Sequence, residues 1–245
     1  MPRSYPISPL TALETWSNSF TKLLAFNLTS YTRVLSLDSD ALLLQPMDEL
    51  FLLPPGPVAM PLAYWLDTRT FSSYILLVQP SVSAFTEIVT AIASSSPTDY
   101  DMEILNRLYS GTAMVLPHRP YGLLTQEFRA KPEEHERYLG DTAEQWDAKR
   151  VFEQAKYVHF SDWPMTKPWL PISPGLMAMM EPRCWEVEGE NWEGKCVERD
   201  IWRGLYREFR ARREVSLVYL FVVISLGLLA SLLERTLTVA EHLFW

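Results

Sequence analysis

The stretch Arg33-Val-Leu-Ser-Leu-Asp-Ser-Asp-Ala-Leu-Leu-Leu44 decides the fold prediction. Its first five residues are an apolar run that predicts a buried strand over 33–37, and this run ends at Asp38-Ser-Asp40 before apolar residues resume at 41–44. Two carboxylates beside a core are costly unless a cation neutralises them. Because residues two apart on a strand project to the same side, we expect Asp38 and Asp40 to converge on one cation.

Strands and helices are expected along most of the remaining chain. Apolar runs predict strands at 58–60, 74–78, 114–116 and 156–160. Helical spacing or a capping residue predicts helices at 13–31, at 82–94 after a Ser81 cap, and at 102–109. Residues 46–51 predict a turn or short helix, 130–150 a helix or loop, and the prolines between 164 and 174 an irregular segment. The alternation predicts an α/β fold, a sheet with helices on its faces.

Composition argues against a general nucleic-acid binder. The 245 residues suffice for one sizeable domain, alone or with an appendage, and 30 acidic against 22 basic residues give a net charge of −8. A nucleic-acid binder needs a basic face to neutralise phosphates, so no nucleic-acid partner is expected. A small anionic ligand remains compatible with this charge, because a bound metal ion inverts the local field.

Two features bear on the compartment. Residues 215–233 are uncharged and strongly apolar, follow several arginines, and at ~1.5 Å per residue are long enough to cross a bilayer core. We expect a membrane helix there with its basic flank cytoplasmic, and a buried core helix is the alternative. The only cysteines, Cys184 and Cys196, predict either a disulfide suited to a secretory lumen or two free thiols.

Five side chains are candidates for chemistry. The carboxylates of Asp38 and Asp40 suit Mn²⁺ or Mg²⁺, and the imidazole of His159 is either a core residue or a third ligand. Lys167 follows as a point-charge partner for phosphate. Asp101 opens a helix, where it either complements the helix dipole or accepts a hydrogen bond from a sugar hydroxyl. The sequence has no GxGxxG, Walker or GxSxG motif, which leaves metal-assisted transfer from a diphosphate as the leading enzymatic interpretation.

The ordered set of fragments resembles the glycogenin-like glycosyltransferases, family eight, and within them the fungal N-acetylglucosaminyltransferase-like branch. The resemblance covers about residues 20 to 170 and rests on Phe20-Thr-Lys-Leu23, Leu28-Thr-Ser-Tyr31, Arg33-Val-Leu35, Leu37-Asp-Ser-Asp-Ala41, Met47-Asp-Glu-Leu-Phe51, Val78-Gln-Pro-Ser81, Asp101 with Ile104-Leu-Asn106, Val158-His-Phe160 and Lys167-Pro-Trp169.

The resemblance implies a GT-A fold, a Rossmann-like mixed sheet flanked by helices, and a retaining transfer of a hexose or N-acetylglucosamine from a UDP-sugar to a glycan or protein acceptor. It implies Mn²⁺ as the cofactor, held by Asp38, Asp40 and His159. Donor binding would involve Lys22, Ser39 and Lys167 beside these ligands, and Asp101 would be catalytic, next to the transferred sugar. The metal and Lys167 would stabilise the leaving UDP as its charge develops.

Three features depart from the family pattern. Only 37 residues precede Asp38, which predicts missing N-terminal strands and an incomplete nucleotide pocket. Ser72-Ser73-Tyr74 stands where the family often has Asn-Ser-Gly, and the apolar run lies near the C-terminus. We therefore expect a transferase domain over 1–200, a basic helix over 201–214 and a transmembrane helix over 215–233, in a Golgi or other secretory membrane. The alternatives are a cytoplasmic location and a non-catalytic, membrane-attached remnant.

Overall fold

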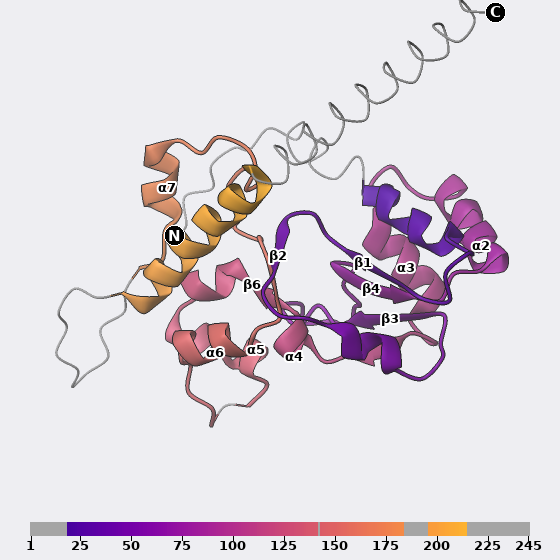
Figure 1. Cartoon of the computed structure of the whole chain (residues 1–245), viewed down its shortest axis with the longest axis horizontal. Helices are drawn as coiled ribbons and strands as arrows, with labels where there is room; N and C mark the ends of the chain where they lie inside the picture. The colour runs from indigo at the N-terminus through magenta and orange to yellow at the C-terminus, as the bar shows by residue number, and fades with distance from the viewer. Residues whose placement is uncertain (1–18, 142, 184–195, 215–245) are drawn as a thin grey trace, which may run out of the picture.

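The computed structural model describes residues 19–141, 143–183 and 196–214, whose strands form two small sheets (Figure 1). The first sheet has the order β1-β4-β3-β5, and the second has the order β2-β7-β6. The strands are β1 (Val34–Leu37), β2 (Ala41–Leu43), β3 (Val58–Pro61), β4 (Ile75–Val78), β5 (Met114–Leu116), β6 (Leu123–Leu124) and β7 (Tyr157–His159).

Strand pairing places His159 between its two neighbours in the second sheet. β2 runs antiparallel to β7 with Ala41 opposite His159, and β6 runs parallel to β7 with Leu124 opposite His159. In the first sheet β4 is antiparallel to both β1 and β3, while β3 and β5 are parallel. The chain passes from the first sheet to the second through residues 38–40, so the Asp-Ser-Asp motif lies where the two sheets meet.

Helices cover the first sheet and build an apolar core with it. The 3₁₀ helix η1 (Ser19–Asn27) and helices α2 (Val82–Ala93) and α3 (Asp101–Tyr109) gather beside β1 and β4 (Figure 1). Ser81 caps α2 as predicted, because its hydroxyl accepts a hydrogen bond of 3.1 Å from the Ala84 amide. The fully buried members of this core include Leu23, Phe26, Met60, Leu76, Val78, Ile88 and Ile104.

A second core surrounds the helix that the structure describes over 197–214. Trp202 and Tyr206 of that helix are buried, together with apolar side chains from β2, β6 and β7. The other short helices are η2 (Asp48–Leu52), α4 (His118–Tyr121), η3 (Thr125–Arg129), η4 (Pro132–Glu134), α5 (Glu136–Leu139), α6 (Ala148–Gln154) and α7 (Pro174–Met180). Figure 1 shows α5, α6 and α7 grouped with the 197–214 helix, away from α2 and α3.

The predicted strands are confirmed to within one or two residues, and the mixed α/β class holds. Three details differ. The chain bends at Ser39, so the strands divide between two sheets. Of the helix predicted over 13–31, the described part is a 3₁₀ helix that ends at Asn27. α7 begins at Pro174 after a Ser173 cap, inside the segment predicted to be irregular, because proline is tolerated in the first helical turn.

The predicted membrane helix over 215–233 lies outside the described residues. Within the described part, no helix combines the length and apolar character needed to cross a bilayer. Cys196 is disulfide-bonded, and Cys184, the chain's other cysteine, lies outside the described residues. The domain boundaries at 200 and 214 stay predictions.

Candidate metal and donor site

The Asp-Ser-Asp loop is held in place by backbone hydrogen bonds. The Asp38 amide donates to the Tyr74 carbonyl at 3.1 Å, and the Phe160 amide donates to the Asp40 carbonyl at 2.9 Å. The buried hydroxyl of Tyr157 lies 3.3 Å from the Asp38 carbonyl and 3.2 Å from the Tyr74 carbonyl. The loop is therefore fixed to both sheets, and the two carboxylates leave it at defined positions.

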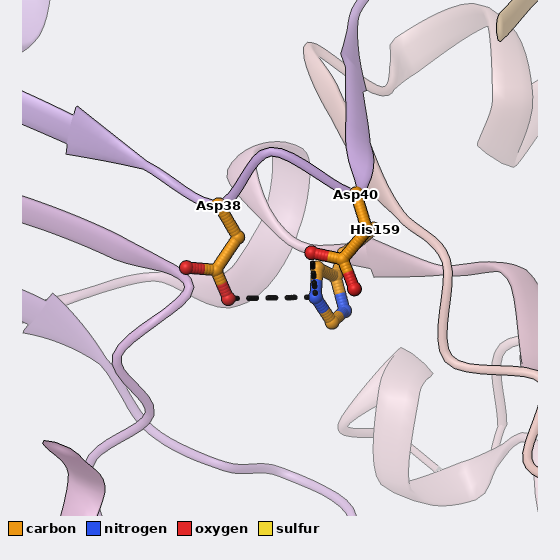
Figure 2. A group of neighbouring side chains, drawn as sticks. All are labelled: Asp38, Asp40 and His159. Carbon is orange, nitrogen blue, oxygen red and sulfur yellow. Dashed lines mark ion pairs between the residues drawn. The ribbon is translucent and has the colours of Figure 1, made fainter. Parts of the chain in front are cut away.

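Asp38, Asp40 and His159 converge as predicted. Figure 2 shows both carboxylates turned toward the imidazole, whose Nε2 lies 3.5 Å from an Asp38 oxygen and 3.4 Å from an Asp40 oxygen. One ligand atom from each residue lies within 4.8 Å of the others. The aspartates converge because the chain bends between two sheets, and strand alternation, the predicted reason, does not apply: Asp38 follows β1 and Asp40 precedes β2.

Two lysines and a third carboxylate complete the cluster. Lys22, on η1, forms ion pairs with Asp38 and with Asp101, the latter at 2.9 Å. Lys167 pairs with Asp40 from the proline-rich loop after β7. Asp101 is buried at the start of α3, and its ion pair with Lys22 joins it to the cluster.

The charges of this cluster are interdependent. Burial lowers the pKa of His159, but hydrogen bonds and charges from Asp38 and Asp40 outweigh burial and raise that pKa to about 9. Burial raises the pKa of Asp38 and of Asp40. Hydrogen bonds and charges from His159 and from one lysine each, Lys22 for Asp38 and Lys167 for Asp40, outweigh burial, so both pKa values lie below the ordinary range. Burial lowers the pKa of Lys22, and its aspartate neighbours raise it overall.

Ring stacking orients the His159 imidazole. Its ring lies 5.7 Å from the Tyr74 ring at an interplanar angle of 23°, and Tyr74 stacks in turn on Tyr157. The other nitrogen, Nδ1, is buried without a hydrogen-bond partner among the described residues. Stacking therefore takes the positioning role that a hydrogen bond to the second nitrogen often has in metal sites.

Of the predicted site residues, six lie in one cluster, and Ser39 lies exposed on the bend between two of them. Sequence reasoning missed the tyrosines at 74 and 157 that hold this cluster. It also missed the contact between Ser161 and Thr125, in which the Ser161 amide donates to the Thr125 hydroxyl at 3.0 Å. A tyrosine inside an apolar run gives no sequence signal, because such rings are common in cores.

The chain is similar to fungal proteins that bear the name Glucose N-acetyltransferase 1. It is 53% identical to the protein from Gibberella zeae over 201 residues, which are 80% of this chain and 43% of that protein. Identity to the Aspergillus fumigatus protein is 45% over 214 residues, covering 82% of this chain and 55% of the relative. The Saccharomyces cerevisiae protein is 24% identical over 83% of this chain and 64% of its own length. This chain thus spans about half the length of the curated relatives it matches.

No protein-family model matches the chain. Among solved structures, the glycosyltransferase GlyE of Streptococcus pneumoniae TIGR4 aligns with a TM-score of 0.48 and 16% identity, over 80% of this chain and 47% of GlyE. The bifunctional glycosyltransferase WbbM aligns with a TM-score of 0.44 and 14% identity, over 68% of this chain and 33% of WbbM. The sequence comparison therefore makes this chain a relative of the fungal proteins named Glucose N-acetyltransferase 1 over the part that it covers.

Proposed function

We propose that this chain carries the donor site of a metal-dependent glycosyltransferase that uses a UDP-sugar and retains the configuration at the sugar. Asp38, Asp40 and His159 converge between two flanking lysines, and this convergence is the main support for the proposal. The names of the relatives make glucose and N-acetylglucosamine the donor sugars to test first.

The residues fit a hard divalent cation of the Mn²⁺ type. Two carboxylates and one imidazole are a donor set that such ions accept, and one ligand atom from each residue lies within 4.8 Å of the others. Bound there, the ion would act as a Lewis acid on a diphosphate. This donor set, placed at the junction of two sheets, supports a GT-A type of site.

Protein groups would supply the remaining interactions. Lys167 lies beside Asp40 on a loop, from which its ammonium would bind the donor diphosphate and stabilise the charge that develops on leaving UDP. Lys22 would hold Asp101 and Asp38 in place from the opposite side. Asp101 is buried and ion-paired with Lys22, and its carboxylate would accept a hydrogen bond from a hydroxyl of the transferred sugar. Reaction would form a bond from an acceptor oxygen to the sugar and break the bond to the diphosphate, releasing UDP and a proton.

The first test is calorimetric titration of the full chain with UDP, with and without Mn²⁺. We expect binding that requires Mn²⁺ and that is lost in Asp40→Asn but kept in Asp48→Asn, an exposed aspartate away from the cluster. Equal UDP binding with and without Mn²⁺ would contradict the metal site. Absence of binding in folded protein would favour the alternative, a non-catalytic relative of such enzymes.

A second assay separates glycosyl from acetyl transfer. The name of the relatives, taken literally, describes acetyl transfer to glucose. Incubation with UDP-N-acetylglucosamine should release UDP, whereas acetyl transfer would release no UDP and would instead consume an acetyl donor such as acetyl-CoA. Release of free thiol from acetyl-CoA without UDP release would overturn the proposed reaction.

A secretory location stays a proposal, and the disulfide at Cys196 supports it. Protein disulfides persist mainly in oxidising compartments such as the secretory lumen. Protease protection of the chain in sealed Golgi vesicles tests this location, and digestion without detergent would contradict it.

A further inference from the structure

A cavity of about 290 Å³ is lined by residues of η3, η4 and α5 together with Tyr64 and Trp65. We call it the Glu127 pocket. Its walls include Tyr64, Trp65, Gln126, Glu127, Arg129 and Arg137. Its volume is close to the lower end of the ~300–1,000 Å³ typical of small-molecule sites. None of these residues belongs to the metal and donor cluster described above.

A buried carboxylate lies in the wall of the pocket. Glu127 is 6% exposed, and within the described part of the chain each of its oxygens has one partner. The Tyr64 hydroxyl donates to Oε1 at 2.9 Å, and the His135 ring nitrogen Nδ1 lies 3.4 Å from Oε2. His135 is itself fixed by stacking on Trp146, with ring centroids 3.8 Å apart. A carboxylate accepts about four hydrogen bonds, so Glu127 keeps acceptor capacity for a ligand that brings hydroxyl donors.

The arginines of the pocket are already neutralised. Arg129 pairs with the buried Asp162 at 3.1 Å, and Arg137 pairs with Asp67 at 2.6 Å while also donating to the Trp65 carbonyl. An anionic ligand would have to compete with these carboxylates and would also face Glu127. The charge pattern therefore favours a neutral ligand rich in hydroxyl groups.

Aromatic rings give the pocket an apolar wall next to its polar one. Tyr64 and Trp65 meet edge to face, with centroids 5.2 Å apart. A hexopyranose combines an apolar face of C–H groups with hydroxyls at its rim, and it matches this combination of rings and carboxylate. Small-molecule sites commonly join aromatic lining with a few polar groups in this way.

The pocket is connected to the donor site by direct contacts. The Gln126 amide donates to the Ser161 hydroxyl at 3.3 Å, two residues beyond His159. On the other side, the Trp65 ring lies 6.1 Å from Tyr74, whose ring stacks on His159. Among the described residues, the Tyr74 ring therefore links the Trp65 wall of the pocket to the imidazole of the candidate metal ligand.

We propose that the Glu127 pocket is a subsite for a neutral hexopyranose of the acceptor, with Glu127 accepting its hydroxyl hydrogens and Trp65 packing on its apolar face. That the hexopyranose belongs to the acceptor rests on the proposed function; that the pocket binds a hexopyranose does not. Saccharide binding and UDP binding are measured separately, so either proposal can fail alone.

The test is saturation-transfer NMR on the full chain with methyl glucoside, galactoside and mannoside, each with and without UDP and Mn²⁺. We expect at least one hexoside to bind, and its binding to persist in excess UDP. Glu127→Gln should weaken that binding about tenfold or more, the effect of losing hydrogen bonds to a charged group. Glu87→Gln, on an exposed face of α2, should leave it unchanged, and UDP binding should be equal in all three proteins.

A second variant is needed because Glu127→Gln also changes the contacts of Tyr64 and His135 and could misfold. Trp65→Leu keeps an apolar side chain but removes the flat ring, so hexoside binding should fall while UDP binding stays. If no hexoside binds the wild-type chain, the subsite assignment is wrong, whatever UDP does. Displacement of the hexoside by UDP would place it in the donor site, and tighter binding of a hexose 6-phosphate would show an anion site; either result overturns the proposal.

Discussion

Replacing Asp162 with asparagine is expected to destabilise the chain strongly. The Asp162 side chain is fully buried and accepts three hydrogen bonds, from Trp202 Nε1 at 2.9 Å, the Tyr206 hydroxyl at 3.0 Å and Arg129 Nη1 at 3.1 Å. Two of these donors lie on the 197–214 helix, so one carboxylate joins that helix to the loop between His159 and Lys167. Asparagine keeps the volume but removes the charge. Its amide nitrogen is a hydrogen-bond donor and would face groups that are themselves donors.

The magnitude follows from the cost of breaking a buried ion pair, about 3–5 kcal/mol. Arg129 is 25% exposed and can recover some hydration, so we expect the lower end, about 3 kcal/mol. For a chain of this size each kcal/mol lowers Tm by about 2–4 °C, which gives a fall of roughly 6–12 °C.

The matched control is Asp67→Asn. Asp67 also pairs with an arginine, Arg137, but its side chain is 87% exposed. Exposed pairs contribute about 0–1 kcal/mol, so this variant should unfold within a few degrees of the wild type. The assay is thermal unfolding by circular dichroism. If Asp162→Asn unfolds no earlier than Asp67→Asn, the buried carboxylate does not hold the two segments together.

Three further outcomes are expected. Mn²⁺ at a hundredfold excess over its Kd should stabilise the wild type by about 2.7 kcal/mol in thermal unfolding, and Asp40→Asn should show no such gain. In chelator, the stability that His159 gains from its raised pKa should be complete below its unfolded value of about 6.5 and lost as pH rises through about 9, and urea titrations of His159→Gln should lack this fall. Gly122→Ala places a Cβ against the Tyr74 hydroxyl, so calorimetry should show a free energy of unfolding lower by about 1–3 kcal/mol, partly recovered when Tyr74→Phe is added.

Local patterns predict the strands well because short apolar runs bounded by polar residues have few other stable environments. A charged partner for the Asp-Ser-Asp loop was also predictable, because carboxylates that end an apolar run beside a core need a counter-charge. His159 and Lys167 could be placed on the chain, but only the resemblance assigned them to the same site. Their proximity depends on β7 pairing with β2, a contact across more than a hundred residues.

Other features lacked any local signal. The division into two sheets arises from one bend at Ser39. The sequence does not distinguish such a bend between two apolar runs from the ordinary end of a strand. Glu127 stands alone among apolar and polar neighbours in Leu124-Thr-Gln-Glu-Phe128, so its burial follows from the partners that the fold brings to it. Asp162 gives a similar case, because its partners on the 197–214 helix lie 40 and 44 residues away.

The charges of the side chains in the cluster indicate how the donor would be recruited. Three carboxylates, Asp38, Asp40 and Asp101, face two lysines and an imidazole whose pKa of about 9 keeps it protonated at neutral pH. The cluster is then balanced and has little attraction for an anion. A divalent cation needs a neutral imidazole, so on the proposed function its binding displaces one proton and leaves one excess positive charge. A diphosphate would therefore bind after the metal or together with it, and UDP affinity without Mn²⁺ should be weak at neutral pH, where His159 is protonated.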